Sequence, residues 1–195
     1  MNVIGLFPTP VTHNYKRFTL DNSLLENLKY ESNLGGNFFT TEQKILDYPE
    51  FQEIKNFIIE NIEKYFNDII SADNITPYIT NSWINLSKEG SQHHKHTHAN
   101  SVLSGVYYLE ADNKSDAITF YKSKYDQIKI YPKFYNLYNS DSWIIPVQTG
   151  DLLLFPSYFE HGVDVCKSKK RISLAFNVFV KGSLGSHESS TFLNI

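Results

Sequence analysis

Hydrophobic and polar residues alternate most regularly in the stretch RISLAFNVFV, residues 171–180. Because successive side chains of a strand point to opposite faces, this alternation predicts a strand with two unlike faces. One face is apolar and consists of Ile172, Leu174, Phe176 and Val178. The other carries one cation among small or polar residues: Arg171, Ser173, Ala175 and Asn177. That second face would leave room for an anion, with Arg171 forking onto a carboxylate and Ser173 adding a hydroxyl. For Arg171 alone, a solvated charge that continues Lys169 and Lys170 is the more frequent alternative.

Short β-prone runs separated by turn residues fill most of the chain after Pro77. Tyr, Phe, Ile, Val and Thr favour strands, and they recur in these runs. The predicted strands are 78–86, the histidine-rich segment that follows, 101–110, 117–122, 127–131, 143–147, 151–155, 162–165 and 171–180. About eight short strands of this kind indicate a mainly β sandwich or barrel.

The N-terminal part predicts one clear helix. It begins near Pro49, which suits a first helical position, and ends near Ile70. Its apolar residues recur at three- and four-residue steps, so it should pack on a sheet rather than bind a separate partner. Asp21 or Asn22 could cap a shorter helix. Residues 3–13 read as an edge strand or arm, and residues 33–45 as a loop with a turn at Gly35-Gly36.

Composition and charge narrow the class of protein. The chain has 195 residues, 41% of them hydrophobic, and a formal charge of −3. We expect one domain, with an arm and helices at 1–76, a β core at 77–181 and a tail at 182–195. The charge argues against a general attraction to nucleic acid or to an anionic membrane. One cysteine excludes a disulfide within the chain. No apolar run reaches transmembrane length and the N-terminus does not resemble a secretory signal, so we expect a cytoplasmic protein.

Four of the seven histidines lie in the segment QHHKHTH, residues 92–98. Imidazole is the commonest protein ligand of iron, zinc and copper. His94, His96 and His98 share one parity, so on an extended strand they would point to one face, and spacing alone does not say which pair binds. A solvated histidine-rich loop is the alternative. Further along, a turn at residues 149–151 and the strand after it lead to His161; a single histidine there would more often be structural.

Several short motifs follow one another along the chain: Trp83-Ile84-Asn85, His96-Thr97-His98-Ala99-Asn100, Ser104-Gly105-Val106-Tyr107-Tyr108, Gly150-Asp151, Phe155-Pro156-Ser157, Glu160-His161-Gly162-Val163 and Arg171-Ile172-Ser173. Taken in order, these motifs resemble the Fe(II)- and 2-oxoglutarate-dependent dioxygenases. More narrowly, the chain is similar to a prolyl-hydroxylase-like subgroup of these oxygenases that is frequent in phages and marine bacteria. The motifs cover about residues 80–180, and their order is more specific than any one of them.

The resemblance implies a mainly β fold, a double-stranded β-helix (jelly-roll) with one or more N-terminal helices packed on the sheet. It also implies a set of site residues. His96, His98 and His161 would be the metal ligands and so the catalytic set. Arg171 and Ser173 would anchor the far carboxylate of 2-oxoglutarate, with Tyr108 and Asn85 near the same co-substrate. His93 and His94 fall outside the family motif, so they would lie around the site or in a loop.

The chain departs from the family pattern at one ligand. The usual metal site has two histidines and one carboxylate, and His98 stands where the carboxylate is expected. With three neutral imidazoles, the metal site would carry one more positive charge than a site with two histidines and one carboxylate. Three histidines and a water molecule are also a common set of zinc ligands. Glu160 or Asp164 could supply an oxygen ligand instead.

The implied activity is hydroxylation of an unknown substrate, a peptidyl residue or a small molecule. The implied cofactors are Fe(II) and 2-oxoglutarate, with O2 as the second co-substrate and succinate and CO2 as products. The alternatives are a cupin-like metal enzyme that does not use 2-oxoglutarate and a non-catalytic jelly-roll binding module. Nucleic acid is not the expected partner, and an oligomer is compatible with the sequence. Residues 122–142 could select substrate at the mouth of the pocket or form a plain exposed insertion.

Overall fold

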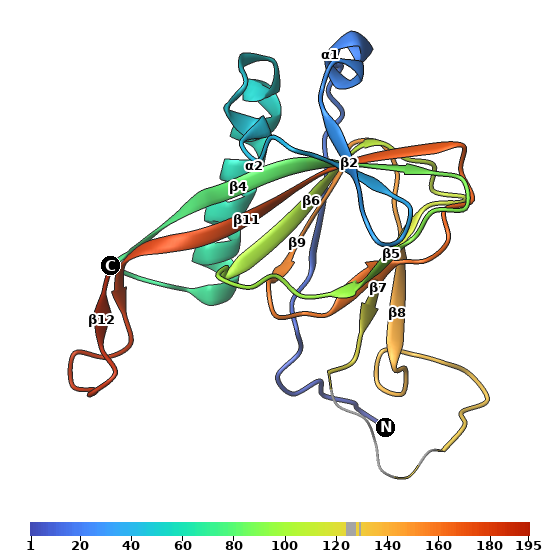
Figure 1. Ribbon diagram of the computed structural model, residues 1–195. Helices are drawn as coiled ribbons and strands as arrows, with labels where there is room; N and C mark the ends of the chain where they lie inside the picture. Colours follow the sequence, from blue (N-terminus) through green and yellow to red (C-terminus); the bar gives the residue numbers. More distant parts are fainter. Residues whose placement is uncertain (124–127, 129) are drawn as a thin grey trace.

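The computed structural model describes residues 1–123, 128 and 130–195, and it consists of two antiparallel sheets that face each other (Figure 1). The larger sheet has the order β1-β9-β6-β11-β4-β3-β2, with β12 paired to β11. The smaller sheet has the order β5-β10-β7-β8. Crossing of the chain between two sheets in this way is the jelly-roll arrangement, so the prediction of a mainly β double-stranded β-helix is confirmed.

The strands of the larger sheet are β1 (Thr12–Tyr15), β2 (Tyr30–Ser32), β3 (Phe38–Thr40), β4 (Ile75–Lys88), β6 (Leu103–Glu110), β9 (Asp151–Pro156), β11 (Lys170–Leu184) and β12 (Leu193–Asn194). Those of the smaller sheet are β5 (His93–His96), β7 (Ala117–Tyr121), β8 (Ser142–Pro146) and β10 (His161–Val163). All are connected by turns and loops, except where the helical segments intervene before β4.

Two long strands, β4 and β11, form the centre of the larger sheet. They pair from Lys170 opposite Lys88 to Gly182 opposite Ile75, with one irregularity after Asn177. The alternation predicted for residues 171–178 is confirmed: Leu174, Phe176 and Val178 are fully buried in the main apolar core. The opposite face of β11 points toward the smaller sheet and lines a cavity there.

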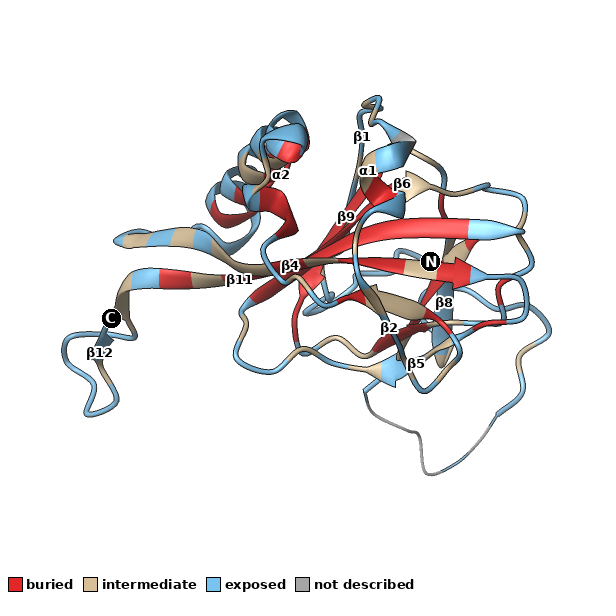
Figure 2. Ribbon diagram, turned by 45° about the horizontal axis from the view of Figure 1, so that its top comes forward, coloured by how far each residue is buried: buried red, intermediate tan, exposed pale blue. Residues whose placement is uncertain are grey.

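The predicted helix covers the outer face of the larger sheet (Figure 2). A 3₁₀ turn at Pro49–Phe51 leads into α2 (Gln52–Lys64), and a π-helical segment, Tyr65–Ile70, follows it. Ile54, Ile58 and Ile62 of α2 are buried in the same core as the apolar face of β11. The short helix α1 (Asn22–Glu26) is capped by Asp21, whose carboxylate accepts a hydrogen bond from the backbone N–H of Ser23 at 2.9 Å.

Several predicted boundaries are wrong. The segment 33–45 is not all loop, because β3 lies within it and pairs with β4. By contrast, the edge strand or arm predicted at residues 3–13 is an arm that leads into β1, an edge strand of the larger sheet that begins at Thr12. Residues 182–195 include the hairpin pair β11–β12. The strand predicted at 127–131 includes two positions, 127 and 129, that lie outside the described residues, and Ile130 and Tyr131 are not in a strand.

Cys166 is buried and forms no disulfide. Its thiol lies 3.2 Å from the Ser168 hydroxyl, which donates to the buried Asp116 carboxylate at 2.8 Å. Within the described residues, no helix has the length and apolar character needed to cross a membrane.

Candidate functional site

A single cavity between the two sheets brings together all seven residues that the sequence singled out. Its lining includes Asn85, His96, His98, Tyr108, His161, Arg171 and Ser173. The same cavity is also lined by Trp83, Val106, Phe155 and Ala175. The histidines come from the smaller sheet and its loop, whereas the other predicted residues come from β4, β6 and β11.

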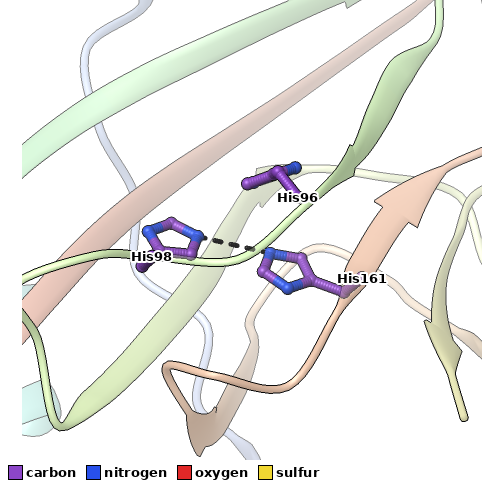
Figure 3. Close-up of side chains that lie close together, drawn as sticks. All are labelled: His96, His98 and His161. Atoms are coloured by element: carbon purple, nitrogen blue, oxygen red, sulfur yellow. Dashed lines mark hydrogen bonds between the residues drawn. The ribbon is translucent and has the colours of Figure 1, made fainter. Parts of the chain in front are cut away.

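Three imidazoles converge at one end of this cavity. His96 is the last residue of β5 and pairs directly with His161, the first residue of β10. One ring nitrogen from each of His96, His98 and His161 lies within 4.8 Å of the others. The Nε2 atoms of His98 and His161 are 3.3 Å apart, drawn as the dashed line in Figure 3. The three side chains therefore point toward a common centre although they are up to 65 positions apart in the chain.

Backbone carbonyls orient two of these rings. The Nδ1–H of His96 donates to the His94 carbonyl at 2.8 Å, and the Nδ1–H of His161 donates to the Phe159 carbonyl at 2.9 Å. With the hydrogen on Nδ1, the lone pair of a neutral imidazole lies on Nε2. Metal-bound histidines are held by this kind of outer contact, which fixes both the tautomer and the direction of the ring.

The three rings are neutral at physiological pH. Burial lowers the pKa of His161 to about 3 and the pKa of His98 to about 4, with the neighbouring His96 adding to both shifts. Burial also lowers the pKa of His96, although the bond to the His94 carbonyl opposes the shift. Neutral imidazoles offer lone pairs to a metal without having to lose a proton first.

The donor set fits a divalent first-row metal. Two imidazole nitrogens bound to one ion at about 2.0–2.1 Å are roughly 3.3 Å apart at a tetrahedral angle and roughly 2.9 Å apart at a right angle. The 3.3 Å between the Nε2 atoms of His98 and His161 falls at this spacing. Because neither atom has a backbone partner in the part of the chain that the structure describes, a shared ion would satisfy both.

The parity argument for the histidines is wrong in part. β5 ends at His96, so His98 reaches the centre from the loop that follows and not from the same strand face. Its position is held by the backbone, since the N–H of His98 donates to the Ser157 carbonyl at 2.9 Å, and its ring stacks on Trp83 with centroids 5.8 Å apart. His94, which shares the parity, is exposed and is not part of the cavity lining.

His93, which sequence reasoning places around the site or in a loop, lines the cavity. Its ring stacks on His96 with centroids 4.5 Å apart. The pairing of β5 with β10 explains this, because His161 pairs with His96 whereas Val163 pairs with His93. Three steps on β5 match two on β10, so a β-bulge brings residues of opposite parity to one face. No local sequence signal marks that bulge.

The far end of the cavity is positively charged. Arg171 is only 4% exposed, and its Nη2 donates to the Ser87 hydroxyl at 2.9 Å. No carboxylate pairs with it among the described residues, and none lines the cavity. A buried cation without a counter-ion is costly, so this end favours an anionic ligand. The alternative of a solvated charge for Arg171 is therefore wrong.

Three polar residues near Arg171 also line the cavity. Ser173 pairs with Asn85 on β4 and with Tyr108 on β6, so the three side chains form one row across the sheet. The Oδ1 atom of Asn85 is buried and has no hydrogen-bond partner among the described residues. Burial raises the pKa of the Tyr108 phenol well above its usual value, so the phenol keeps its proton and can donate it in a hydrogen bond.

The carboxylates considered as substitutes for His98 lie elsewhere. Asp164 is exposed and accepts a hydrogen bond from the Thr119 hydroxyl at 3.3 Å. Neither Asp164 nor Glu160 belongs to the converging group or lines the cavity. Of residues 122–142, positions 124–127 and 129 lie outside the described residues, and the rest of the segment is mostly exposed and contributes nothing to the cavity lining.

Comparisons with known proteins agree with this geometry. The family model described as "Putative 2OG-Fe(II) oxygenase" matches residues 81–177. No curated protein matches the sequence.

Solved structures with the same fold are distant in sequence. HygX from Streptomyces hygroscopicus, with nickel and 2-oxoglutarate bound, has a TM-score of 0.61 at 11% identity and covers 87% of this chain and 82% of its own. A prolyl-4-hydroxylase from Pseudomonas putida has a TM-score of 0.56 at 12% identity, covering 87% and 92%. An oxidoreductase of the 2OG-Fe(II) oxygenase family from Burkholderia pseudomallei has a TM-score of 0.55 at 14% identity, covering 80% and 74%.

Proposed function

The chain belongs to the 2OG-Fe(II) oxygenase superfamily, and from that premise we propose that it is a hydroxylase dependent on Fe(II) and 2-oxoglutarate. Its primary substrate would be a peptidyl residue or a small molecule. The observation that carries the proposal is the pairing, in one cavity, of three convergent neutral imidazoles with a buried arginine that has no acidic partner among the described residues.

We assign the metal to His96, His98 and His161. The support for this assignment is their shared centre, their lowered pKa values and the carbonyl bonds that leave Nε2 of His96 and His161 free. With His98 in place of a carboxylate, a divalent metal keeps both of its charges at this end. A dianionic co-substrate is attracted more strongly to such a centre than to one already neutralised by an acid.

We assign the far carboxylate of 2-oxoglutarate to Arg171 and Ser173. A guanidinium can bind a carboxylate through two parallel hydrogen bonds, and burial strengthens them. Tyr108 would donate its phenol hydrogen to the same ligand, and Asn85 would donate to it through its amide NH₂, the only part of that side chain that can bond to an anion. HygX was solved with nickel and 2-oxoglutarate bound, which is consistent with a site of this class on this fold.

Bound Fe(II) with 2-oxoglutarate would supply the means to activate O2. In the overall reaction, 2-oxoglutarate, O2 and a substrate C–H give succinate, CO2 and a substrate C–OH, so one oxygen atom enters each organic product. The residues of this chain hold the co-substrate, keep its carboxylate between Arg171 and Ser173, and exclude water with Trp83, Val106 and Phe155.

The proposal is tested first by binding. Protein loaded with Ni(II), which does not turn over, is titrated with 2-oxoglutarate, and protein loaded with Fe(II) is then supplied with O2 and screened against peptides and small metabolites for succinate formation. We expect saturable binding that requires the metal, and succinate equal to the 2-oxoglutarate consumed. Metal binding without 2-oxoglutarate binding would point to a cupin-like enzyme, and failure to bind any metal would point to a non-catalytic module.

A further inference from the structure

His93 lines the same cavity as the three imidazoles and Arg171. On the smaller sheet it pairs with Val163, two residues beyond the His161–His96 pair on β10. From Val163 the chain runs through a short connection to β11, whose second residue is Arg171. On its other side, His93 follows the turn that leaves β4 just after Ser87, the hydrogen-bond partner of Arg171. Two short connections therefore link His93 and its partner Val163 to the strands that carry Ser87 and Arg171.

The two connections are tied to each other, which fixes this part of the wall. The N–H of Gly90 donates to the Cys166 carbonyl at 2.9 Å, and the N–H of Cys166 donates to the Ser91 carbonyl at 2.7 Å. The segment that contains Asn33 and Gly35 packs against these two connections, because the N–H of Gln92 donates to the Gly35 carbonyl at 2.9 Å. A Cβ atom at Gly35 would lie 2.0 Å from the Gln92 carbonyl oxygen, so only glycine permits this approach.

Asn33, in the same segment as Gly35, determines which ring nitrogen of His93 carries the hydrogen. The Nδ2 amide of Asn33 lies 3.5 Å from Nε2 of His93, and the Oδ1 of the same amide accepts from the Leu34 N–H at 2.7 Å. An amide NH₂ only donates, so Nε2 of His93 accepts and its hydrogen is on Nδ1. Among the described residues, this Nδ1–H has no acceptor.

His93 and Arg171 line the same cavity as the three imidazoles. A ligand bound in that cavity therefore has both the Nδ1–H of His93 and the guanidinium of Arg171 among the donors around it. The family motif assigns no role to His93, because that motif begins at His96.

We propose that His93 is a further co-substrate-binding residue, whose Nδ1–H donates to the distal carboxylate that Arg171 holds, with Asn33 fixing the tautomer. This inference rests on the function proposed above. It extends the carboxylate site to both sheets: Arg171 and Ser173 bind from the larger sheet, and His93 binds from the smaller one. The alternative is a purely structural role, in which His93 only supports His96 through the stacking of their rings.

The experiment compares two ligands on matched variants. 2-Oxoglutarate and 2-oxopentanoate have the same chain length and the same metal-chelating group, but only the first has a distal carboxylate. Each is titrated into Ni(II)-loaded wild-type protein, His93→Phe and His187→Phe. Phenylalanine keeps a flat ring against His96 and removes the N–H. His187→Phe is the control and should bind both ligands as wild type does, since His187 is exposed and lies outside the cavity lining.

We expect His93→Phe to weaken 2-oxoglutarate at least about tenfold, as loss of a hydrogen bond to a charged group does, and to leave 2-oxopentanoate within about twofold of wild type. Asn33→Ala should show a smaller loss in the same direction. Equal losses for both ligands, or no loss for either, would overturn the inference, because His93 would then act through His96 or not at all. If wild-type protein binds 2-oxopentanoate and 2-oxoglutarate equally, the carboxylate assignment to Arg171 fails as well.

Discussion

The two ends of the cavity are built in different ways. Arg171, Ser173 and Asn85 stand on β4 and β11, which have 14 and 15 residues and pair in regular register along this part of the sheet. The histidines stand on β5 and β10, which have four and three residues, and on a loop. The arginine end is fixed by a continuous ladder before any ligand arrives. The histidine end has few such bonds, so we expect it to gain order from the metal itself.

The largest expected effect is at the histidine end. His161→Ala removes one of three ligands and should lower the affinity for Ni(II) or Fe(II) by at least about 100-fold, more than the loss of a supporting outer contact costs. Isothermal titration with Ni(II) measures it, and His187→Ala, an exposed histidine in the C-terminal hairpin, is the control. Unchanged affinity would mean that the three imidazoles do not share an ion.

At the arginine end, Arg171→Ala should weaken 2-oxoglutarate by about 2–5 kcal/mol, as expected when one partner of a buried charged pair is removed. The metal affinity should stay near wild type, because the ladder of β4 and β11 does not depend on this side chain. Lys170→Ala, whose exposed ammonium pairs with Glu110 at 2.8 Å, is the matched control. A loss of metal binding in Arg171→Ala would show that the two ends are not independent.

His98→Asp tests how the charge of one end acts on the other. The new carboxylate should tighten metal binding and weaken 2-oxoglutarate by on the order of 1–3 kcal/mol, since one negative charge now opposes the dianion through an effective dielectric constant of about 20. Titration of the metal first and of 2-oxoglutarate second separates the change in metal affinity from the change in 2-oxoglutarate affinity. His98→Asn adds no charge, so it should change the affinity for 2-oxoglutarate only slightly. Equal losses of 2-oxoglutarate affinity in both variants would refute the electrostatic reason.

Acid should destabilise the metal-free protein through the histidine end. Burial lowers the pKa of His161 to about 3, whereas an unfolded histidine titrates near 6.5. Between these values the unfolded chain binds a proton that the folded chain does not, so stability is complete above about pH 6.5 and falls as pH decreases toward 3. The slope for one such group is about 1.4 kcal/mol per pH unit. Urea unfolding at pH 7 and pH 5 should show this loss, and His161→Asn should reduce it.

The same contrast explains what the sequence could predict. Alternation along residues 171–178 placed Arg171 and Ser173 on the cavity face, because a long regular strand obeys a period of two. The helix predicted from Pro49 to Ile70 rests on the same reasoning, which holds along α2, where Ile54, Ile58 and Ile62 are buried. It fails at the end of the π-helical segment, where Ile69 and Ile70 are exposed. The histidines could not be placed by parity, because a bulge in β5 and a loop after it break the period. Only their order along the family motif identified them, and His93, outside that motif, was expected only around the site or in a loop.

The smallest effect should come from Ser87, which supports the arginine end without touching the metal. Its hydroxyl accepts from Nη2 of Arg171 at 2.9 Å and is the only hydrogen-bond partner of that guanidinium among the described residues. Ser87→Ala should weaken 2-oxoglutarate by about 0.5–1.5 kcal/mol, the usual net value of one such bond, because Arg171 can still reach the carboxylate but is held less firmly. Titration of the Ni(II)-loaded variant measures it. The double variant Ser87→Ala/Arg171→Ala should bind no worse than Arg171→Ala alone; a further loss would mean that Ser87 acts on the co-substrate by another route.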